Sequence, residues 1–209
     1  MTIKLGINGF GRIGRMTLRS IIESKRKDIE VVAINNRGNA EVSSFLLAHD
    51  TIHGPLKNKI NYSEQSISID GKKINMTQQK EISDINWGKH KVDVVLECTG
   101  KFNSKEESAQ HIKSGAKKVL VSAPCKDVSN IVFGVNHKNI NSKDEIISAA
   151  SCTTNCLAPV AKVLNDNFKI ERGFMTTIHS YTTDQRLLDN SHQDLRRARA
   201  ATNSMIPTT

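Results

Sequence analysis

A glycine-spaced turn near the N-terminus, Gly9-Phe10-Gly11-Arg12-Ile13-Gly14, constrains the fold of this chain more than any other feature. It follows a short run, Lys4 to Asn8, that predicts a β-strand. The apolar residues after the turn predict a helix that ends near Lys25, and a second apolar run, Glu30 to Ile34, closes the unit. The sequence therefore predicts a strand, helix, strand unit with the glycines at its first turn.

The three glycines have different roles in such a unit. Gly9 permits the tight turn, Gly11 lets the backbone approach a pyrophosphate, and Gly14 lets the helix pack closely on the strand. The alternative is a glycine turn that binds nothing, and the flanking strand and helix argue against it. We expect a dinucleotide at this turn.

The end of the second strand bears on the type of dinucleotide. Units that bind NAD usually carry Asp or Glu there, about 20 residues after the glycines, on the ribose 2′-hydroxyl. This chain has Asn35 and Asn36 followed by Arg37. No carboxylate would repel a 2′-phosphate and an arginine could pair with one, so the sequence favours NADP over NAD.

The following residues continue to alternate between helix and strand. Strict alternation in Ser66–Ile74 around Asp70-Gly71 predicts a hairpin. The remaining predicted elements are a helix over 40–49, a strand over 92–96, a helix over 104–113 and a strand over 118–122. This order predicts an α/β fold with a doubly wound parallel sheet, whose ligands bind at the carboxyl ends of the strands. Thr99, Gly100 and Ser122 fall at such ends.

A cysteine among small polar residues, Ser151-Cys152-Thr153-Thr154-Asn155, follows the predicted strand 146–150. Helical spacing of apolar residues begins at Leu157, which places Cys152 at or just before a helix N-terminus. Such a position favours an anion and lowers the pKa of a thiol, so Cys152 is a candidate nucleophile. The alternative is a buried structural cysteine, for which four polar neighbours make a poor core.

The last part of the chain is less regular. Pro159 predicts that the helix after Cys152 starts late or kinks. Gly173 to Tyr181 reads as a strand with His179, a candidate base, near its end, although a histidine at the surface or core edge is the alternative. The stretch 182–209 is polar and basic, and we interpret its end as that of an interrupted chain.

Composition limits the partners. The net charge of +9 indicates anionic ligands, but aromatic residues make up only 4%, too few for the stacking that single-strand nucleic-acid binders use. The four cysteines form no Cys-x-x-Cys pair, so we expect reduced thiols and no metal site. No signal peptide or membrane span is evident, so we expect a cytoplasmic protein with no membrane partner.

Five motifs stand out along the chain: Ile7–Arg15, Glu97–Gly100, Ser122–Pro124, Ser151–Pro159 and Thr176–Thr182. Together they closely resemble phosphorylating glyceraldehyde-3-phosphate dehydrogenase of the bacterial type. The resemblance runs from Lys4 to Thr209 and covers about two thirds of a usual family member. It implies a Rossmann-type dinucleotide domain over 1–151 and the start of an incomplete α+β catalytic domain over 152–209.

The resemblance implies the reaction and its residues. Cys152 resembles the nucleophile that attacks the aldehyde of glyceraldehyde 3-phosphate, and His179 resembles its base. Hydride transfer to NAD or NADP then leaves a thioester, which inorganic phosphate cleaves to 1,3-bisphosphoglycerate. The residues that match substrate and phosphate contacts are Ser151, Thr153, Thr182 and Arg199. Those that match cofactor contacts are Gly9, Gly11, Arg12, Ile13, Gly14, Asn36, Arg37, Lys80, Thr99, Gly100 and Ser122.

Two departures from the family pattern concern the cofactor. NAD-specific relatives usually have Asp at the position of Asn36, and commonly Leu-Pro where this chain has Asn190-Ser191, a loop that crosses a subunit interface in the family's tetramers. Both departures resemble NADP-accepting forms. The resemblance also implies a homotetramer, and it implies that this chain alone is inactive because further substrate and nicotinamide contacts lie beyond Thr209.

Two alternatives stay open. Erythrose-4-phosphate dehydrogenases share Ser-Cys-Thr-Thr-Asn and the histidine, although Tyr181-Thr182 is more like the triose enzyme. The other alternative is a secondary nucleotide- or RNA-binding role for the basic stretch Arg186 to Arg199, whose arginines are better explained by phosphate and interface contacts.

Overall fold

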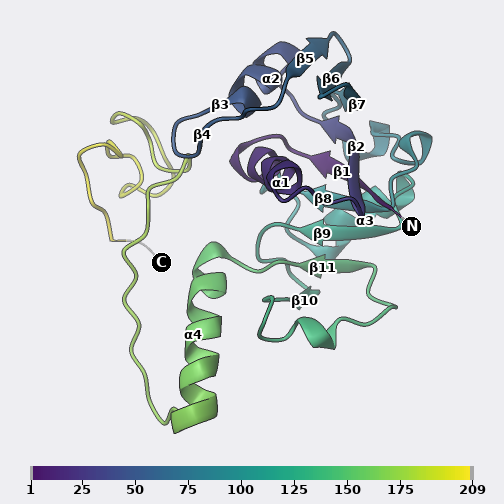
Figure 1. Ribbon diagram of the computed structural model, residues 1–209. Coiled ribbons are helices and arrows are strands. Elements are labelled where there is room, and N and C mark those ends of the chain that lie inside the picture. The colour runs from purple at the N-terminus through teal and green to yellow at the C-terminus, as the bar shows by residue number, and fades with distance from the viewer. Residues whose placement is uncertain (1, 208–209) are drawn as a thin grey trace. The chain divides into compact units, whose positions relative to one another are not determined.

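A computed structural model of the chain describes residues 2–207 (Figure 1). They form two compact units, which divide between Lys169 and Ile170. The helices of the described part are α1 Arg12–Glu23, α2 Ala40–Ala48, α3 Lys105–Lys113 and α4 Cys152–Phe168, with short 3-10 helices at Ile82–Asp84, Gly88–His90 and His137–Asn139. The strands are β1 Ile3–Asn8, β2 Ile29–Asn35, β3 His49–Asp50, β4 Gly54–Pro55, β5 Ile60–Ser63, β6 Ser66–Ile69, β7 Lys72–Thr77, β8 Val94–Glu97, β9 Lys118–Val121, β10 Ser129–Asn130 and β11 Ile146–Ser148.

The first unit is built on a nine-stranded sheet in the order β10-β11-β9-β8-β1-β2-β7-β6-β5. All pairs from β10 to β7 are parallel, and only β6 and β5 at one edge run antiparallel. The chain leaves β1 toward β2 and later returns to β8 on the other side of β1. The predicted doubly wound α/β fold is therefore confirmed, and its topological switch point lies between β1 and β8.

Helices cover both faces of this sheet. The crossovers through α1 and through α3 run in opposite directions, so the right-handed rule places the two helices on opposite faces (Figure 1). Leu5 and Ile7 of β1 pack in one core cluster with Leu18 of α1. On the other face, the ring of Trp87 occupies the space beside Gly6, where a Cβ atom would lie 2.7 Å from the indole. The single tryptophan thus packs directly under β1.

The predicted hairpin is confirmed at Asp70-Gly71. These two residues have φ values of 49° and 82° and join the antiparallel strands β6 and β7. Positive φ at both central positions is the geometry of a type I′ turn, which matches the strand twist. The hairpin adds β6 and β5 to the parallel part of the sheet through β7.

One prediction for the later part of the chain was wrong: Gly173 to Tyr181 forms no strand, and no strand within residues 2–207 pairs with it. Of the two predictions for the helix that contains Pro159, the late start is also wrong, because helix α4 runs from Cys152 to Phe168 with the proline inside it. Ser151 caps its N-terminus, accepting a hydrogen bond from Thr154 N at 2.9 Å, so the helix begins before the apolar spacing indicates.

The second unit is irregular and is held by charged pairs. Arg197 pairs with Asp184 at 2.9 Å, and Arg196 pairs with Asp194 at 2.8 Å. No helix within residues 2–207 is long and apolar enough to cross a membrane.

Candidate functional site

The glycine turn joins β1 to α1 at the carboxyl edge of the sheet. Gly9 has a φ of +92°, and a Cβ atom there would lie 2.8 Å from the backbone of Cys98 and Thr99. A Cβ atom on Gly14 would overlap the carbonyl oxygen of Gly9. Both positions therefore require glycine because neighbouring backbone atoms approach closely, which for Gly14 agrees with the predicted close packing of the helix on the strand.

Gly11 differs from the other two glycines because nothing lies within 4 Å of a Cβ atom built on it. It is the N-cap residue of α1, with no side-chain hydrogen bond to the cap and no acidic residue in the first turn. The first backbone N–H groups of a helix lack acceptors within the helix and favour an anion. The open space and the donors fit the pyrophosphate of a dinucleotide.

Arg12, in the first turn of α1, is held from outside the turn. Its guanidinium forms an ion pair with the buried carboxylate of Asp50. Asp50 also accepts from His53 N at 2.9 Å and from Ile52 N at 3.0 Å. The His53 N–H bond, together with Arg12, lowers the pKa of Asp50 to about 2. The next residue, Ile13, is half exposed at 50%.

Asn36 follows β2 and reaches back to the glycine turn. Its Oδ1 accepts from Phe10 N at 3.3 Å, and its Nδ2 donates to Ser43 Oγ at 3.2 Å. Arg37 beside it is exposed, and Asn39 caps α2 through a bond from Val42 N at 2.9 Å. The structure therefore places Asn36 and Arg37 beside the glycine turn, next to the N-terminus of α2.

A row of polar side chains crosses the last positions of four neighbouring parallel strands. Asn8 of β1 lies in register with Glu97 of β8 and with Asn35 of β2, which pairs in turn with Thr77 of β7. Asn8 Nδ2 donates to Glu97 at 2.6 Å, Asn35 Nδ2 to Asn8 at 2.8 Å and Thr77 Oγ1 to Asn35 at 2.9 Å. Asn8, Asn35 and Glu97 are buried.

The row continues beyond Glu97 into the layer beneath α3. Glu97 accepts from Thr99 N at 2.7 Å and also from the Thr99 hydroxyl. His111 Nε2 lies 2.9 Å from Glu97, and Trp87 Nε1 donates to His111 Nδ1 at 3.0 Å. Sequence reasoning named Thr99 but missed the partners that hold it. The sequence feature that could have indicated these partners was Glu97, a carboxylate at the end of an apolar strand.

The other predicted cofactor residues lie on loops at the same edge. Lys80 is exposed after β7, Gly100 has a φ of +70° after β8, and Ser122 follows β9 with its N–H donating to Glu97 O at 2.9 Å. Beside them, burial raises the pKa of the Cys98 thiol to about 11. This cysteine is therefore a protonated structural thiol at neutral pH.

Cys152 is the first residue of the 17-residue helix α4 and is exposed. The helix has no acidic residue in its first turn, and β11 before it runs parallel to β9, so Cys152 emerges at the carboxyl edge. Ala150, between strand and helix, has a φ of +58°. Asn155 Nδ2 holds the turn by donating to Ala149 O at 2.7 Å. Ser151 and Thr153 flank the thiol and are partly buried.

The second unit carries the remaining predicted residues. His179 Nδ1 lies 2.6 Å from Ser180 O, a contact in which Nδ1 carries a proton and donates it to the carbonyl oxygen. Thr182 and Arg199 are exposed, and Arg199 pairs with Asp189 at 3.3 Å. Asn190 and Ser191 lie in irregular backbone, where Ser191 N donates to Asn190 Oδ1 at 2.7 Å. Cys152 and His179 belong to different units.

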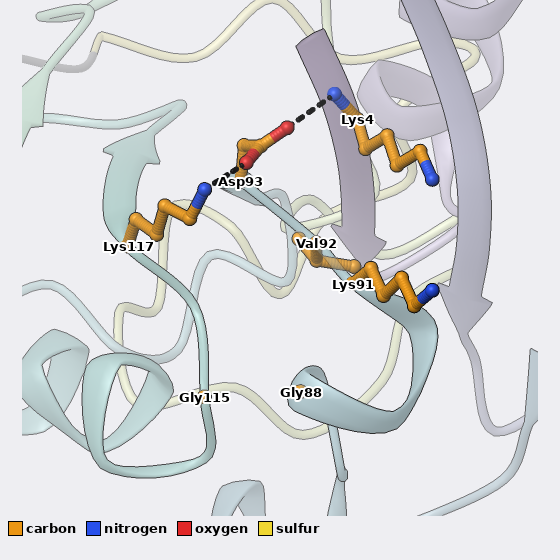
Figure 2. A pocket seen from close by; sticks show the side chains of 7 residues that line it. All are labelled: Lys4, Gly88, Lys91, Val92, Asp93, Gly115 and Lys117. Carbon is orange, nitrogen blue, oxygen red and sulfur yellow. Dashed lines mark hydrogen bonds and ion pairs between the residues drawn. The ribbon is translucent and has the colours of Figure 1, made fainter.

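A hollow of about 430 Å³ lies at the other ends of the strands, the amino ends, away from the glycine turn (Figure 2). Its lining includes Lys4, Lys91 and Lys117 around Asp93, at the amino ends of β1, β8 and β9. Asp93 accepts from Lys117 Nζ at 2.7 Å and from Lys4 N at 2.9 Å. Because ligands of doubly wound sheets bind at the carboxyl ends, this hollow is not the candidate site.

Comparison with known proteins decides the family. Residues 3–105 match the domain described as glyceraldehyde 3-phosphate dehydrogenase, NAD binding domain, and residues 151–209 match the C-terminal domain of the same enzyme. This chain belongs to the glyceraldehyde-3-phosphate dehydrogenase family. The predicted resemblance is thereby confirmed, and the first match covers the glycine turn, Asn36 and the end of β8.

Individual members of the glyceraldehyde-3-phosphate dehydrogenase family align along the whole chain. The protein of that name from Streptomyces coelicolor is 52% identical over 211 residues, covering 100% of this chain and 62% of the relative. Those from Cereibacter sphaeroides and Geobacillus stearothermophilus are 53% and 49% identical with the same coverage. The chain therefore spans about 62% of the length of these relatives.

Proposed function

We propose that this chain is the cofactor-binding and nucleophile-bearing part of an oxidoreductase that oxidises glyceraldehyde 3-phosphate with phosphorylation. The observation that carries the proposal is the place of Cys152. It begins a 17-residue helix at the carboxyl edge of the same sheet whose switch point bears the glycine turn. A nucleophile and a dinucleotide crevice on one edge are what hydride removal from a covalently held aldehyde requires.

In this proposal the Cys152 thiolate adds to the aldehyde carbon, and the first turn of α4 favours the negative charge of the sulfur. His179 Nε2, which has taken the proton of the Cys152 thiol, gives that proton to the aldehyde oxygen as the thiolate adds. Nε2 then accepts it back from the hydroxyl while the carbon loses a hydride, which leaves a thioester on Cys152. The nicotinamide cofactor, when bound in the crevice, takes up that hydride. An oxygen of inorganic phosphate attacks the thioester carbon and expels the Cys152 thiolate, which completes the cycle.

The phosphate groups would be held by hydroxyl and guanidinium groups. Ser151 and Thr153 flank the thiol, and Thr182 and Arg199 come from the second unit. Hydroxyls and a guanidinium fork suit phosphate oxygens. We further propose a cytoplasmic homotetramer, on the resemblance of the chain to a family that assembles in this way.

We propose that NADP is accepted alongside or in preference to NAD. The support is the amide of Asn36 at the crevice edge, with the exposed Arg37 beside it. Asn190 and Ser191 point to the same cofactor through their departure from the NAD-specific pattern. A carboxylate at position 36 would repel a 2′-phosphate, and the amide does not.

The test is steady-state turnover of the full-length protein that contains this chain. Glyceraldehyde 3-phosphate and erythrose 4-phosphate are compared as aldehydes, with and without phosphate, and NAD⁺ is compared with NADP⁺. The proposal expects phosphate-dependent oxidation of the triose, with NADP⁺ used at least as well as NAD⁺. Preference for the tetrose, or a KM for NADP⁺ far above that for NAD⁺, would contradict the corresponding part.

A single substitution tests the cofactor argument separately. Asn36→Asp should lower kcat/KM for NADP⁺ by about tenfold, because a carboxylate then faces the 2′-phosphate, and should spare NAD⁺. Asn61→Asp on the exposed strand β5 adds the same charge away from the crevice and should change neither value. Equal effects of both variants would show that only net charge matters.

A further inference from the structure

The hydrogen bonds of the polar row have a defined direction, which can be read from both ends. At one end, Gln79 N donates to Asn35 Oδ1 at 2.8 Å and Asn35 Nδ2 donates to Gln79 O at 3.0 Å. The two backbone groups fix which amide atom of Asn35 is oxygen and which is nitrogen. Asn35 must then donate to Asn8, and Asn8 must donate to Glu97.

At the other end, the direction is set by an indole. Trp87 Nε1 can only donate, so His111 Nδ1 must accept and cannot carry a proton. The proton of His111 is therefore on Nε2, which donates to Glu97. His111 is neutral in this arrangement, and it has no exposed surface.

Glu97 is consequently the acceptor at which both chains of donors end. Asn8 and His111 donate to one carboxylate oxygen, and the N–H and hydroxyl of Thr99 donate to the other. Three of these groups, the Asn8 amide, the His111 Nε2–H and the Thr99 N–H, can only donate, and they surround a side chain that is 1% exposed. Such a set of donors suits a carboxylate that accepts at both oxygens.

We propose that Glu97 is a positioning residue for the dinucleotide, which acts by locking the two strand ends on either side of the crevice. Its bond to Asn8 bridges β1 and β8 at the switch point, and its bonds to Thr99 fix the turn into Gly100. Gly9 touches the same backbone, since its Cα leaves no room for a Cβ beside Thr99 N. The inference rests on the proposed function in requiring that a dinucleotide bind this crevice.

The arrangement makes the isosteric amide a severe change. In Glu97→Gln, the side-chain NH₂ must face either Asn8 and His111 or the two donors of Thr99. Asn8 cannot turn because Asn35 and Gln79 hold it, and His111 cannot change tautomer because Trp87 occupies Nδ1. The amide therefore loses two hydrogen bonds when its NH₂ faces Asn8 and His111, and loses at least the bond from Thr99 N when it faces Thr99, whose hydroxyl can turn to accept.

The experiment measures NAD⁺ and NADP⁺ binding to the 209-residue chain by isothermal titration, with thermal unfolding recorded in parallel. Glu97→Gln should weaken the binding of both dinucleotides by about tenfold or more, because the Thr99 turn serves either cofactor. Val119→Ala on β9 serves as the matched control. It removes buried methyl groups away from the polar row, so it should lower the melting temperature without changing either Kd.

Two further variants test the role of Glu97 if Glu97→Gln alone does not fold. Thr99→Val removes one donor and leaves the carboxylate in place, so binding should weaken by about threefold to tenfold. Adding Asn8→Asp to Glu97→Gln moves the charge one strand along and restores an acceptor opposite the new NH₂. This double variant should recover a measurable part of the lost affinity, which a general packing defect would not do.

The outcomes separate the two claims. A parent chain that binds neither dinucleotide would contradict the proposed function and this inference with it. Parent binding that persists unchanged in Thr99→Val and Glu97→Gln would overturn the role of Glu97 alone. Equal loss of affinity in Val119→Ala would also overturn it, because stability and not position would then govern binding.

Discussion

At the scale of single residues, the three glycines of the turn have different surroundings. Gly9 and Gly14 lie against backbone atoms that cannot move, whereas Gly11 faces open space. A side chain at the first two positions therefore disturbs the fold. At Gly11 it fills only the volume that a ligand would use.

This contrast gives a matched pair of variants. Gly14→Ala should lower the free energy of unfolding by about 2 kcal/mol or more, because its Cβ overlaps Gly9 O. Gly11→Ala should cost only about 1 kcal/mol, since glycine is the better N-cap residue, yet it should clearly weaken dinucleotide binding. Urea unfolding and titration with NAD⁺ measure the two effects. If Gly11→Ala still bound NAD⁺ as strongly as the parent, the pyrophosphate would not bind at this turn.

The pKa of Asp50 predicts how stability depends on acid. Its folded-state value of about 2 lies below the ordinary 3.8, so the carboxylate stabilises the fold above about pH 4. That contribution should be lost as the pH falls toward 2. Urea unfolding at several pH values should show a shallower loss for Asp50→Asn than for the parent. Parallel curves would mean that the fold does not lower the pKa of Asp50 in solution.

At the scale of elements, α4 combines a good start with an internal defect. Ser151 caps it and Cys152 occupies its first position, but Pro159 cannot donate a hydrogen bond to Asn155 O. The first turn, which carries the thiol, therefore has a side-chain cap and lies before the missing hydrogen bond. Its second half begins where one rung of the hydrogen-bond ladder is absent.

Replacing the proline tests that description. Pro159→Ala should stabilise α4, and amide exchange over residues 160–164 should slow by about tenfold or more. Ala158→Gly, one position earlier, should speed exchange over the same residues because glycine weakens a helix interior. Hydrogen exchange followed by mass spectrometry measures both. No change in Pro159→Ala would mean that the proline costs the helix nothing.

At the scale of the whole molecule, the sequence predicted those features that depend on residues close together in the chain. The glycine turn, the Asp70-Gly71 hairpin and the strand ends at Thr99 and Ser122 were predicted because spacing and turn chemistry lie within a few residues. Asn8 and Glu97 are 89 positions apart, and Arg12 and Asp50 are 38 apart. No short pattern could indicate such pairs, because each depends on the completed sheet.

The wrong strand at Gly173 to Tyr181 has the same origin. Alternation predicts an extended segment, but a strand also needs a neighbour, and none within residues 2–207 pairs with it. The site residues divide in the same way. The structure brings the glycine turn, Asn36, Thr99 and Cys152 to the carboxyl ends of the strands in the first unit, while His179, Thr182 and Arg199 lie in the second.

The measurement that tests the central claim most directly is a single turnover without phosphate. The full-length protein that contains this chain is mixed with glyceraldehyde 3-phosphate and NAD⁺ or NADP⁺, and reduced cofactor is followed by absorbance. We predict a burst close to one equivalent per subunit, which stops until phosphate is added and is absent in Cys152→Ser. A burst of equal size in Cys152→Ser would contradict the account, because the thioester could not then form on this cysteine.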